Sequence, residues 1–160
     1  MGGKQDSARI IHISLDDKVL VARSPDIEHE RRVAIFDLIE SNHFQLASGK
    51  SGPYRVILSL IDKGIKFEVR DEQDNLLQDI EVSMTPFRRR IRDYFMVCES
   101  YFEAIRTATP NRIETIDQAR RGLHNESAEL LQSRLADYVK MDMDTARRLF
   151  TLISVLQIRG

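Results

Sequence analysis

Between residues 87 and 105, apolar side chains recur at steps of three and four residues, and this run dictates much of what the chain can form. Such steps place the side chains on one face of an α-helix for about five turns. The members of the run are Phe87, Ile91, Tyr94, Phe95, Cys98, Tyr101, Phe102 and Ile105. Proline suits the first position of a helix, so Thr85-Pro86 marks its start, and Pro110 disfavours a helical Thr109. We therefore predict a long aromatic helix with one buried face.

The residues before Val82 follow a different pattern, in which apolar and polar side chains alternate. This two-residue period is typical of strands with one buried face. The predicted strands cover residues 9–15, 54–61, 65–70 and 76–82. Short turns separate the last three strands, which predicts an antiparallel meander that the first strand is able to join. We expect the aromatic helix to cover the apolar face of this meander.

Helices account for most of the remaining chain. One is expected from Pro25 to about Glu40, and helical periodicity continues from Pro110 to the end. Gly122 leaves two alternatives open, because a glycine inside a helix costs about 1 kcal/mol. Either the helix breaks there and Asn125 or Ser127 caps a new one, or it continues through Gly122. A last helix is expected from about Asp144.

Together these elements predict the α+β class: an antiparallel β-meander packed on a long aromatic helix, with a helical C-terminal half. A length of 160 residues suits one domain, so we expect a flexible tail over residues 1–8 and a single α+β domain over residues 9–160. The single cysteine, Cys98, excludes an internal disulfide and a multi-thiolate metal site. No apolar run approaches the roughly 20 residues of a membrane-spanning helix. We therefore expect a cytoplasmic protein without a membrane partner.

Catalytic and metal-binding patterns are weak in this sequence. Zinc sites need three or four converging ligands, and the four histidines form no close pair of the HExxH kind, so we predict no metal and no cofactor. His124-Asn125-Glu126 has the His-x-Glu spacing of base deaminases but lacks their Pro-Cys-x-x-Cys partner. We interpret these three residues as a polar corner in which His124 bonds a neighbouring carbonyl. Cys98 lies on the apolar stripe and is expected to be a buried, inert thiol.

The first turns of two predicted helices carry arginines. These are Arg88, Arg89 and Arg90 in the aromatic helix and Arg147 and Arg148 in the last helix. Cations at a helix N-terminus oppose the helix dipole, by about 0.3 to 1 kcal/mol each when exposed. Either carboxylates of the more acidic first half compensate for them, or an anion binds where guanidinium and helix N–H groups converge. The carboxylates available are Glu28, Glu30, Asp71 and Glu72. The five arginines are therefore a candidate anion-binding site.

Five segments carry a resemblance to a known family. They are SPDIEHERRVAIFDLIE (24–40), GPYR (52–55), TPFRRRIRDYFMVCESYFEAIRTATP (85–110), IDQARRGLHNE (116–126) and DTARRLFTLISVLQIRG (144–160). In order and spacing they resemble bacterial uncharacterised protein family 0262 over nearly the whole chain. The resemblance implies a small bacterial cytosolic protein and transfers no catalytic residue.

Two functional hypotheses from different classes remain. The first is a non-catalytic binding or adaptor module whose arginine-lined anion site or helix surface holds a protein, a phosphorylated ligand or RNA. The second is a small hydrolase or nuclease in which His124 and Glu126 perform acid–base chemistry while arginines hold phosphate. We prefer the first, because no catalytic constellation has the spacing that its chemistry needs. A homodimer through a sheet edge or the last helix is a further hypothesis.

Overall fold

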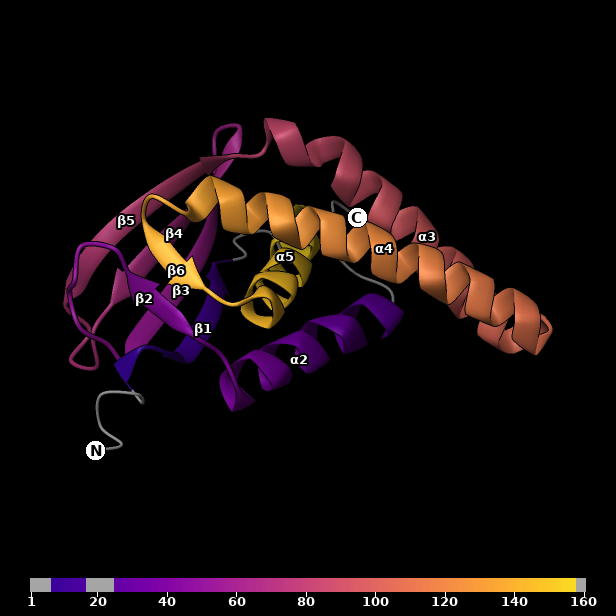
Figure 1. The fold of residues 1–160 in the computed structure, drawn as a ribbon, viewed down its shortest axis with the longest axis horizontal. Coiled ribbons are helices and arrows are strands. Elements are labelled where there is room, and N and C mark those ends of the chain that lie inside the picture. The colour runs from indigo at the N-terminus through magenta and orange to yellow at the C-terminus, as the bar shows by residue number, and fades with distance from the viewer. Residues whose placement is uncertain (1–6, 17–24, 158–160) are drawn as a thin grey trace.

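The predicted meander forms three strands of a four-stranded sheet, and helices cover one of its faces (Figure 1). The computed structural model describes residues 7–16 and 25–157, so most of the expected tail over residues 1–8 lies outside the described residues. The elements in chain order are β1 (Ile10–Asp16), α2 (Pro25–Glu40), β2 (Phe44–Leu46), β3 (Tyr54–Ile61), β4 (Gly64–Arg70), β5 (Leu76–Ser83), the short 3₁₀ helix η1 (Thr85–Phe87), α3 (Arg88–Thr107), α4 (Pro110–Leu135), β6 (Val139–Met141) and α5 (Met143–Gln157).

The strand order of the sheet is β1-β3-β4-β5, with β3, β4 and β5 antiparallel and β1 parallel to β3. The α+β class and the antiparallel meander are therefore confirmed, and the first strand joins the sheet. A parallel pair needs a crossover connection, and the segment that contains α2 provides it. Val56 and Val69 pair on the buried face, while Ile57 and Glu68 pair on the opposite face.

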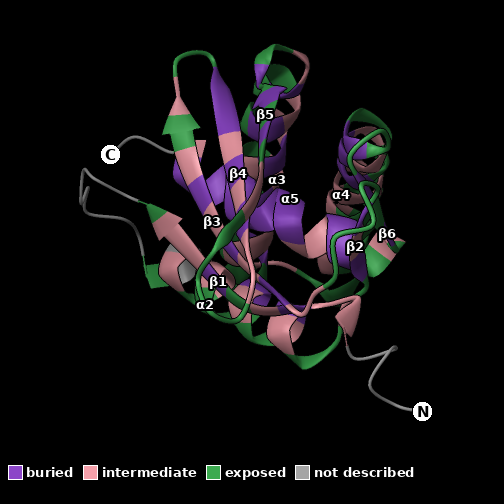
Figure 2. Cartoon of the chain, turned by 90° about the vertical axis from the view of Figure 1, so that its left-hand side faces the viewer, coloured by how far each residue is buried: buried purple, intermediate pink, exposed green. Residues whose placement is uncertain are grey.

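The helix α5 packs on β3 and is coloured mostly as buried in Figure 2, while the aromatic helix α3 also packs along α4. The predicted packing of the meander with the aromatic helix is confirmed, because Ile91 and Tyr94 of α3 belong to the same buried core as Phe67 of the sheet. Ten of the fifteen residues of α5 are buried, and a helix that is apolar on most sides belongs in the centre of a fold. The helix α3 exposes Met96 and Glu99 and lies in the outer layer, although Tyr94 still reaches the core.

The helix α4 runs without interruption from Pro110 to Leu135, so the continuous alternative at Gly122 is confirmed. A Cβ atom built at Gly122 would meet no atom within 4 Å, because this stretch of the helix faces solvent. The Ser127 hydroxyl donates to the Leu123 carbonyl at 2.8 Å inside the helix instead of capping a new one. Helices α3 and α4 lie side by side and extend away from the sheet (Figure 1).

A second sheet, of two strands, joins β2 to β6 in antiparallel fashion. Its strands are three residues long, and the pair links Phe44 to Met141 across almost a hundred residues of sequence. So short a strand shows no period of its own, which is why the sequence predicts no strand at Val139–Met141. The pairing holds the end of α2 near the start of α5, where the candidate site lies.

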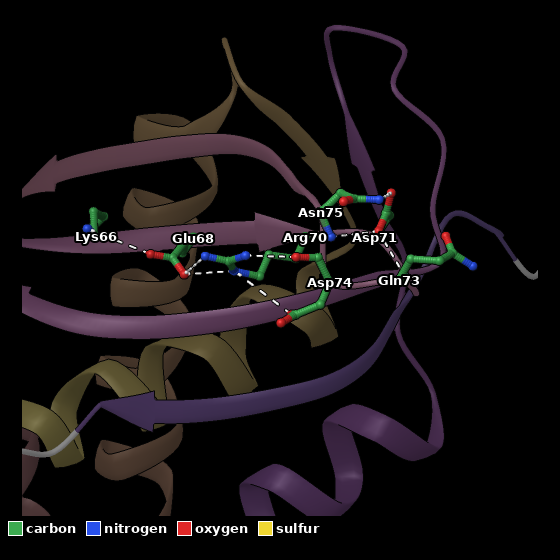
Figure 3. Close-up of polar contacts among 7 residues, drawn as sticks. All are labelled: Lys66, Glu68, Arg70, Asp71, Gln73, Asp74 and Asn75. Carbon is green, nitrogen blue, oxygen red and sulfur yellow. Dashed lines mark hydrogen bonds and ion pairs between the residues drawn. The ribbon is translucent and has the colours of Figure 1, made fainter.

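The outer face of the main sheet is polar, as its alternation predicts. On β4, Glu68 lies between Lys66 and Arg70, with an Nζ–Oε1 distance of 3.8 Å and an Nη2–Oε2 distance of 2.8 Å (Figure 3). In the following turn, Asp71 Oδ1 accepts the backbone N–H of Asn75 at 2.9 Å, which lowers the pKa of Asp71. These partly exposed contacts stabilise the turn between β4 and β5.

Candidate functional site

A cleft of about 260 Å³ opens between α2, α4 and α5. Its polar lining consists of Glu30 and Asp37 from α2, His124 from α4, and Asp144, Arg147, Arg148 and Thr151 from α5. Steps of three and four residues place the four α5 side chains on one side of that helix, and Glu30 and Asp37 are two helical turns apart. The cleft thus brings together three of the predicted site residues, namely His124, Arg147 and Arg148.

The His124 imidazole is held in place by α5. Its Nε2 lies 2.9 Å from the Arg147 carbonyl oxygen and 3.0 Å from Thr151 Oγ1. A carbonyl only accepts hydrogen bonds, so Nε2 carries the proton and donates it, as the sequence-based interpretation expects. The Tyr94 ring stacks on the imidazole, with ring centroids 5.2 Å apart. Burial lowers the pKa of His124, and the guanidinium groups of Arg120 and Arg147 lower it further, so the imidazole is neutral near pH 7.

Arg147 joins α5 to α4. Its Nε donates to Asn125 Oδ1 and its Nη1 to Asp144 Oδ1, each at 2.6 Å. Asn125, a member of the predicted polar corner, therefore positions this guanidinium. An arginine side chain has five N–H donors. Among the described residues the other three donors of Arg147 have no hydrogen-bond partner.

Arg148 reaches from α5 to the C-terminal end of α2. Its Nη1 donates to the carbonyl of Ser41, at 3.1 Å, just beyond the end of that helix. A cation is favourable at this position, because the last carbonyls of a helix carry partial negative charge. The remaining four N–H donors of Arg148 have no partner in the part of the chain that the structure describes.

Carboxylates balance these two arginines. Glu30 and Asp37 make no hydrogen bond or ion pair with any described residue through their carboxylates, although they line the same cleft. With Asp144, the lining holds three carboxylates, two guanidinium groups and one neutral imidazole, which gives a formal charge of -1. The acidic α2 and the arginines of α5 do come together, as the sequence allows. The cleft is nevertheless a site of mixed charge and not a purely cationic one.

Tyr94 lines a second, much smaller cavity next to the cleft. This cavity has a volume of about 10 Å³, and Glu30 and Thr151 line both the cavity and the cleft. Tyr94 is 1% exposed, and its hydroxyl makes no hydrogen bond of normal geometry with the described residues. Burial raises the pKa of Tyr94 and raises the pKa of Cys98 to about 11, so both groups stay protonated. Cys98 is therefore a buried thiol of low reactivity, and the Tyr94 hydroxyl is an unused donor.

The other predicted site residues lie elsewhere. Arg88, Arg89 and Arg90 form the first turn of α3, which does not border the cleft. Within the described residues their ion pair is that of Arg89 Nε with Asp93 Oδ2, at 3.9 Å on the same helix. Glu126 is exposed on α4 and also does not line the cleft. The five arginines thus do not form one cluster.

Several residues of the cleft were missed by sequence reasoning. Asp37, Asp144 and Thr151 line the cleft, yet each reads from the sequence as part of an ordinary helix face. A usable signal exists in α5, where Asp144, Arg147, Arg148 and Thr151 follow helical spacing on a helix that is otherwise apolar. Such a polar stripe on a central helix indicates a hydrated cleft.

Residues 7–16 and 25–157 contain neither a metal-binding cluster nor a membrane-spanning helix. In that part of the chain, no three His, Cys, Asp or Glu side chains gather in a way that could hold a metal ion. No helix in it combines the length and the apolar character that crossing a bilayer requires.

Comparison with known proteins identifies a family that matches this chain. The model of an uncharacterised protein family, UPF0262, matches residues 7–159. This chain belongs to family UPF0262. A UPF0262 protein of Rhodospirillum rubrum is 53% identical over 159 residues, which cover 99% of this chain and 98% of the relative. A UPF0262 protein of Erythrobacter litoralis is 54% identical over 156 residues, and one of Rhizobium etli is 53% identical over 153 residues.

These matches extend over nearly the full length of each UPF0262 relative, with 98% of the Erythrobacter protein and 96% of the Rhizobium protein covered. The predicted resemblance is therefore confirmed. No solved structure matches the chain.

Proposed function

We propose that this chain is a non-catalytic binding protein, and that its cleft between α2, α4 and α5 holds a small ligand with one anionic and one cationic group. The observation that supports this proposal is the presence of free guanidinium donors and free carboxylates in one concave site. Arg147 and Arg148 offer N–H donors that no described residue uses, and Glu30 and Asp37 offer free carboxylates.

The geometry suits such a ligand at both of its ends. A ligand carboxylate or phosphate fits the guanidinium groups, which bind planar anions through paired N–H donors. A ligand ammonium fits the carboxylates of α2. The cleft volume of about 260 Å³ lies just below the ~300–1,000 Å³ of common ligand pockets, which favours a molecule the size of an amino acid.

The other hypotheses have less support from this geometry. RNA or a highly phosphorylated ligand would meet a lining with three carboxylates and no excess of positive charge. A hydrolase or nuclease would need Glu126 beside His124 in the cleft, and Glu126 is exposed outside it. The cytoplasmic location expected from the single buried Cys98 remains part of the proposal.

Thermal unfolding of the full chain with a panel of free amino acids tests the proposal. A binder at about a hundredfold its Kd adds roughly 2.7 kcal/mol of stability, which raises Tm by several degrees. N-acetylation or C-terminal amidation of the same amino acid should abolish the shift, because each derivative loses one charge. Inorganic phosphate serves as the probe for simple anion binding.

Two variants locate the site. Arg148→Gln and Asp37→Asn should each remove the shift, while Arg112→Gln, an exposed change on α4 outside the cleft, should leave it intact. The proposal is wrong if no free amino acid stabilises the chain, or if phosphate alone stabilises it as strongly as the best amino acid does.

A further inference from the structure

The outward face of α2 carries an apolar patch of Phe36 and Val33, which borders the cleft through Val33. Phe36 is 67% exposed and Val33 is 40% exposed. Beside them lies a hollow of about 550 Å³, which we call the α2 hollow, lined by Arg9, Arg32, Ile35, Phe36, Ile39 and Glu40. Side chains of this size are buried in most folds, and an exposed apolar patch beside a hollow indicates a contact with another molecule.

The charges around Phe36 have a symmetric arrangement. Arg32 lies four residues before Phe36 and Glu40 lies four residues after it. Residues four apart follow one ridge of a helix, so the ridge reads cation, aromatic ring, anion. The centre of this sequence is Phe36, and its two ends carry opposite charges.

We infer that the outward face of α2 is an isologous dimer interface, in which two copies of this chain pack their α2 helices antiparallel about a two-fold axis at Phe36. In that arrangement, a residue that lies a given number of positions before Phe36 in one copy faces the residue that lies the same number of positions after Phe36 in the other copy. Arg32 of one copy then meets Glu40 of the other, and Val33 meets Ile39. Phe36 enters the α2 hollow of the partner.

The opposite orientation has no such complementarity. If the two-fold axis ran along the helices, Arg32 would face Arg32 and Glu40 would face Glu40. Like charges in contact are unfavourable, so the antiparallel orientation is the one that the charges select. This inference does not rest on the proposed ligand, because Glu30 and Asp37 lie on a different side of α2 from Phe36.

The expected association is weak. A helix of 16 residues is about 24 Å long, so a contact through α2 buries less than the roughly 1,600 Å² of a standard interface. Sedimentation velocity of the full chain over two decades of concentration should therefore show a monomer that converts to a dimer. A chain that stays monomeric at every concentration contradicts the inference.

Variants of the apolar centre test the place of contact. Phe36→Glu should abolish the dimer, because it puts a charge at the two-fold axis. Met96→Glu is the matched control, since Met96 is 61% exposed on α3, away from the α2 hollow. Both changes are at exposed positions, so Tm should stay near that of the wild type. A dimer that survives Phe36→Glu overturns the inference.

A charge exchange tests the orientation. Arg32→Glu and Glu40→Arg should each weaken the dimer by about tenfold or more, since each replaces two attractive contacts by two repulsive ones. The double variant Arg32→Glu/Glu40→Arg should restore the wild-type Kd to within about threefold, because the opposite charges meet again. Single variants without effect, or a double variant as weak as the singles, contradict the antiparallel contact.

Discussion

His124 illustrates how its surroundings, and not its sequence neighbours, decide the role of a residue. In the sequence it stands two positions before Glu126, in a spacing that catalytic sites use. In the structure Glu126 points to solvent, while His124 bonds the Arg147 carbonyl and stacks on Tyr94. A buried imidazole that donates through Nε2 connects α4 to α5. It therefore supports the wall of the cleft as a neutral group.

The pH dependence of stability tests this neutral state. Burial lowers the pKa of His124 below its value of about 6.5 in an unfolded chain, so the unfolded state binds the proton more readily. The stabilisation is complete above pH 6.5 and is lost as the pH falls toward the folded-state pKa. Within that window the free energy of unfolding should fall by at most about 1.4 kcal/mol per pH unit.

Urea unfolding between pH 5 and about pH 8 measures this effect. His124→Gln keeps a donor for the Arg147 carbonyl and should remove the part of the slope that His124 causes. Gln118→Asn, a change without a titratable group at an exposed position on α4, should leave the slope unchanged. An identical slope in His124→Gln and the wild type would contradict a buried, neutral His124.

At the scale of elements, sequence periodicity alone does not predict how deeply α5 is buried or that α4 continues through Gly122. The spacing in α3 is the more conspicuous stripe, yet α5, which also packs on the sheet, is the more deeply buried helix. The helix α4 passes through Gly122 because neighbouring turns on both sides keep their hydrogen bonds. The cost of one exposed glycine is smaller than the cost of ending a helix that packs along α3 and α5.

Gly122→Ala should stabilise the protein by up to about 1 kcal/mol, because alanine has the higher helix propensity and restricts the unfolded chain. A Cβ atom there meets nothing within 4 Å, so no steric cost opposes the gain. Chemical unfolding measures the change. Gly64→Ala is the contrasting variant and should destabilise, since its Cβ would lie 2.7 Å from the Val82 carbonyl oxygen. A loss of stability in Gly122→Ala would contradict a continuous α4.

At the scale of the whole molecule, burial is distributed unevenly. The centre lies where α5 meets the sheet, and the hairpin of α3 and α4 extends away from it (Figure 1). No residue from Ile105 to Gly122 is buried, whereas α5 holds ten buried residues. Among the described residues, the far end of the hairpin thus depends mainly on contacts between α3 and α4. Regions with few buried contacts open at lower free energy than the core.

Hydrogen exchange measured on peptides checks this distribution. Amides near Thr107 to Ile116, at the far end of the hairpin, should exchange faster than those of α5. The difference should reflect local opening, so it should persist under conditions where the whole protein stays folded. Equal protection of both regions would mean that the hairpin end is stabilised by contacts beyond those of α3 with α4.

The secondary structure of this chain could be predicted because it depends on residues that are close together in the sequence. Alternation over 54–61, 65–70 and 76–82 predicts the meander, and the stripe from Phe87 to Ile105 predicts α3. Proline at residues 25, 86 and 110 predicts where helices begin. These patterns reflect which side of each element avoids water, and each element carries that information in its own residues.

Long-range placement was decided by packing. The parallel pairing of β1 with β3, the contact of α5 with the sheet and the pairing of β2 with β6 join segments far apart in the chain. The cleft depends on these placements, because it exists only when α2, α4 and α5 bring Glu30, His124 and Arg148 to one place. No single segment contains that information. Many arrangements satisfy each element alone, and only the burial of all their apolar faces together selects one.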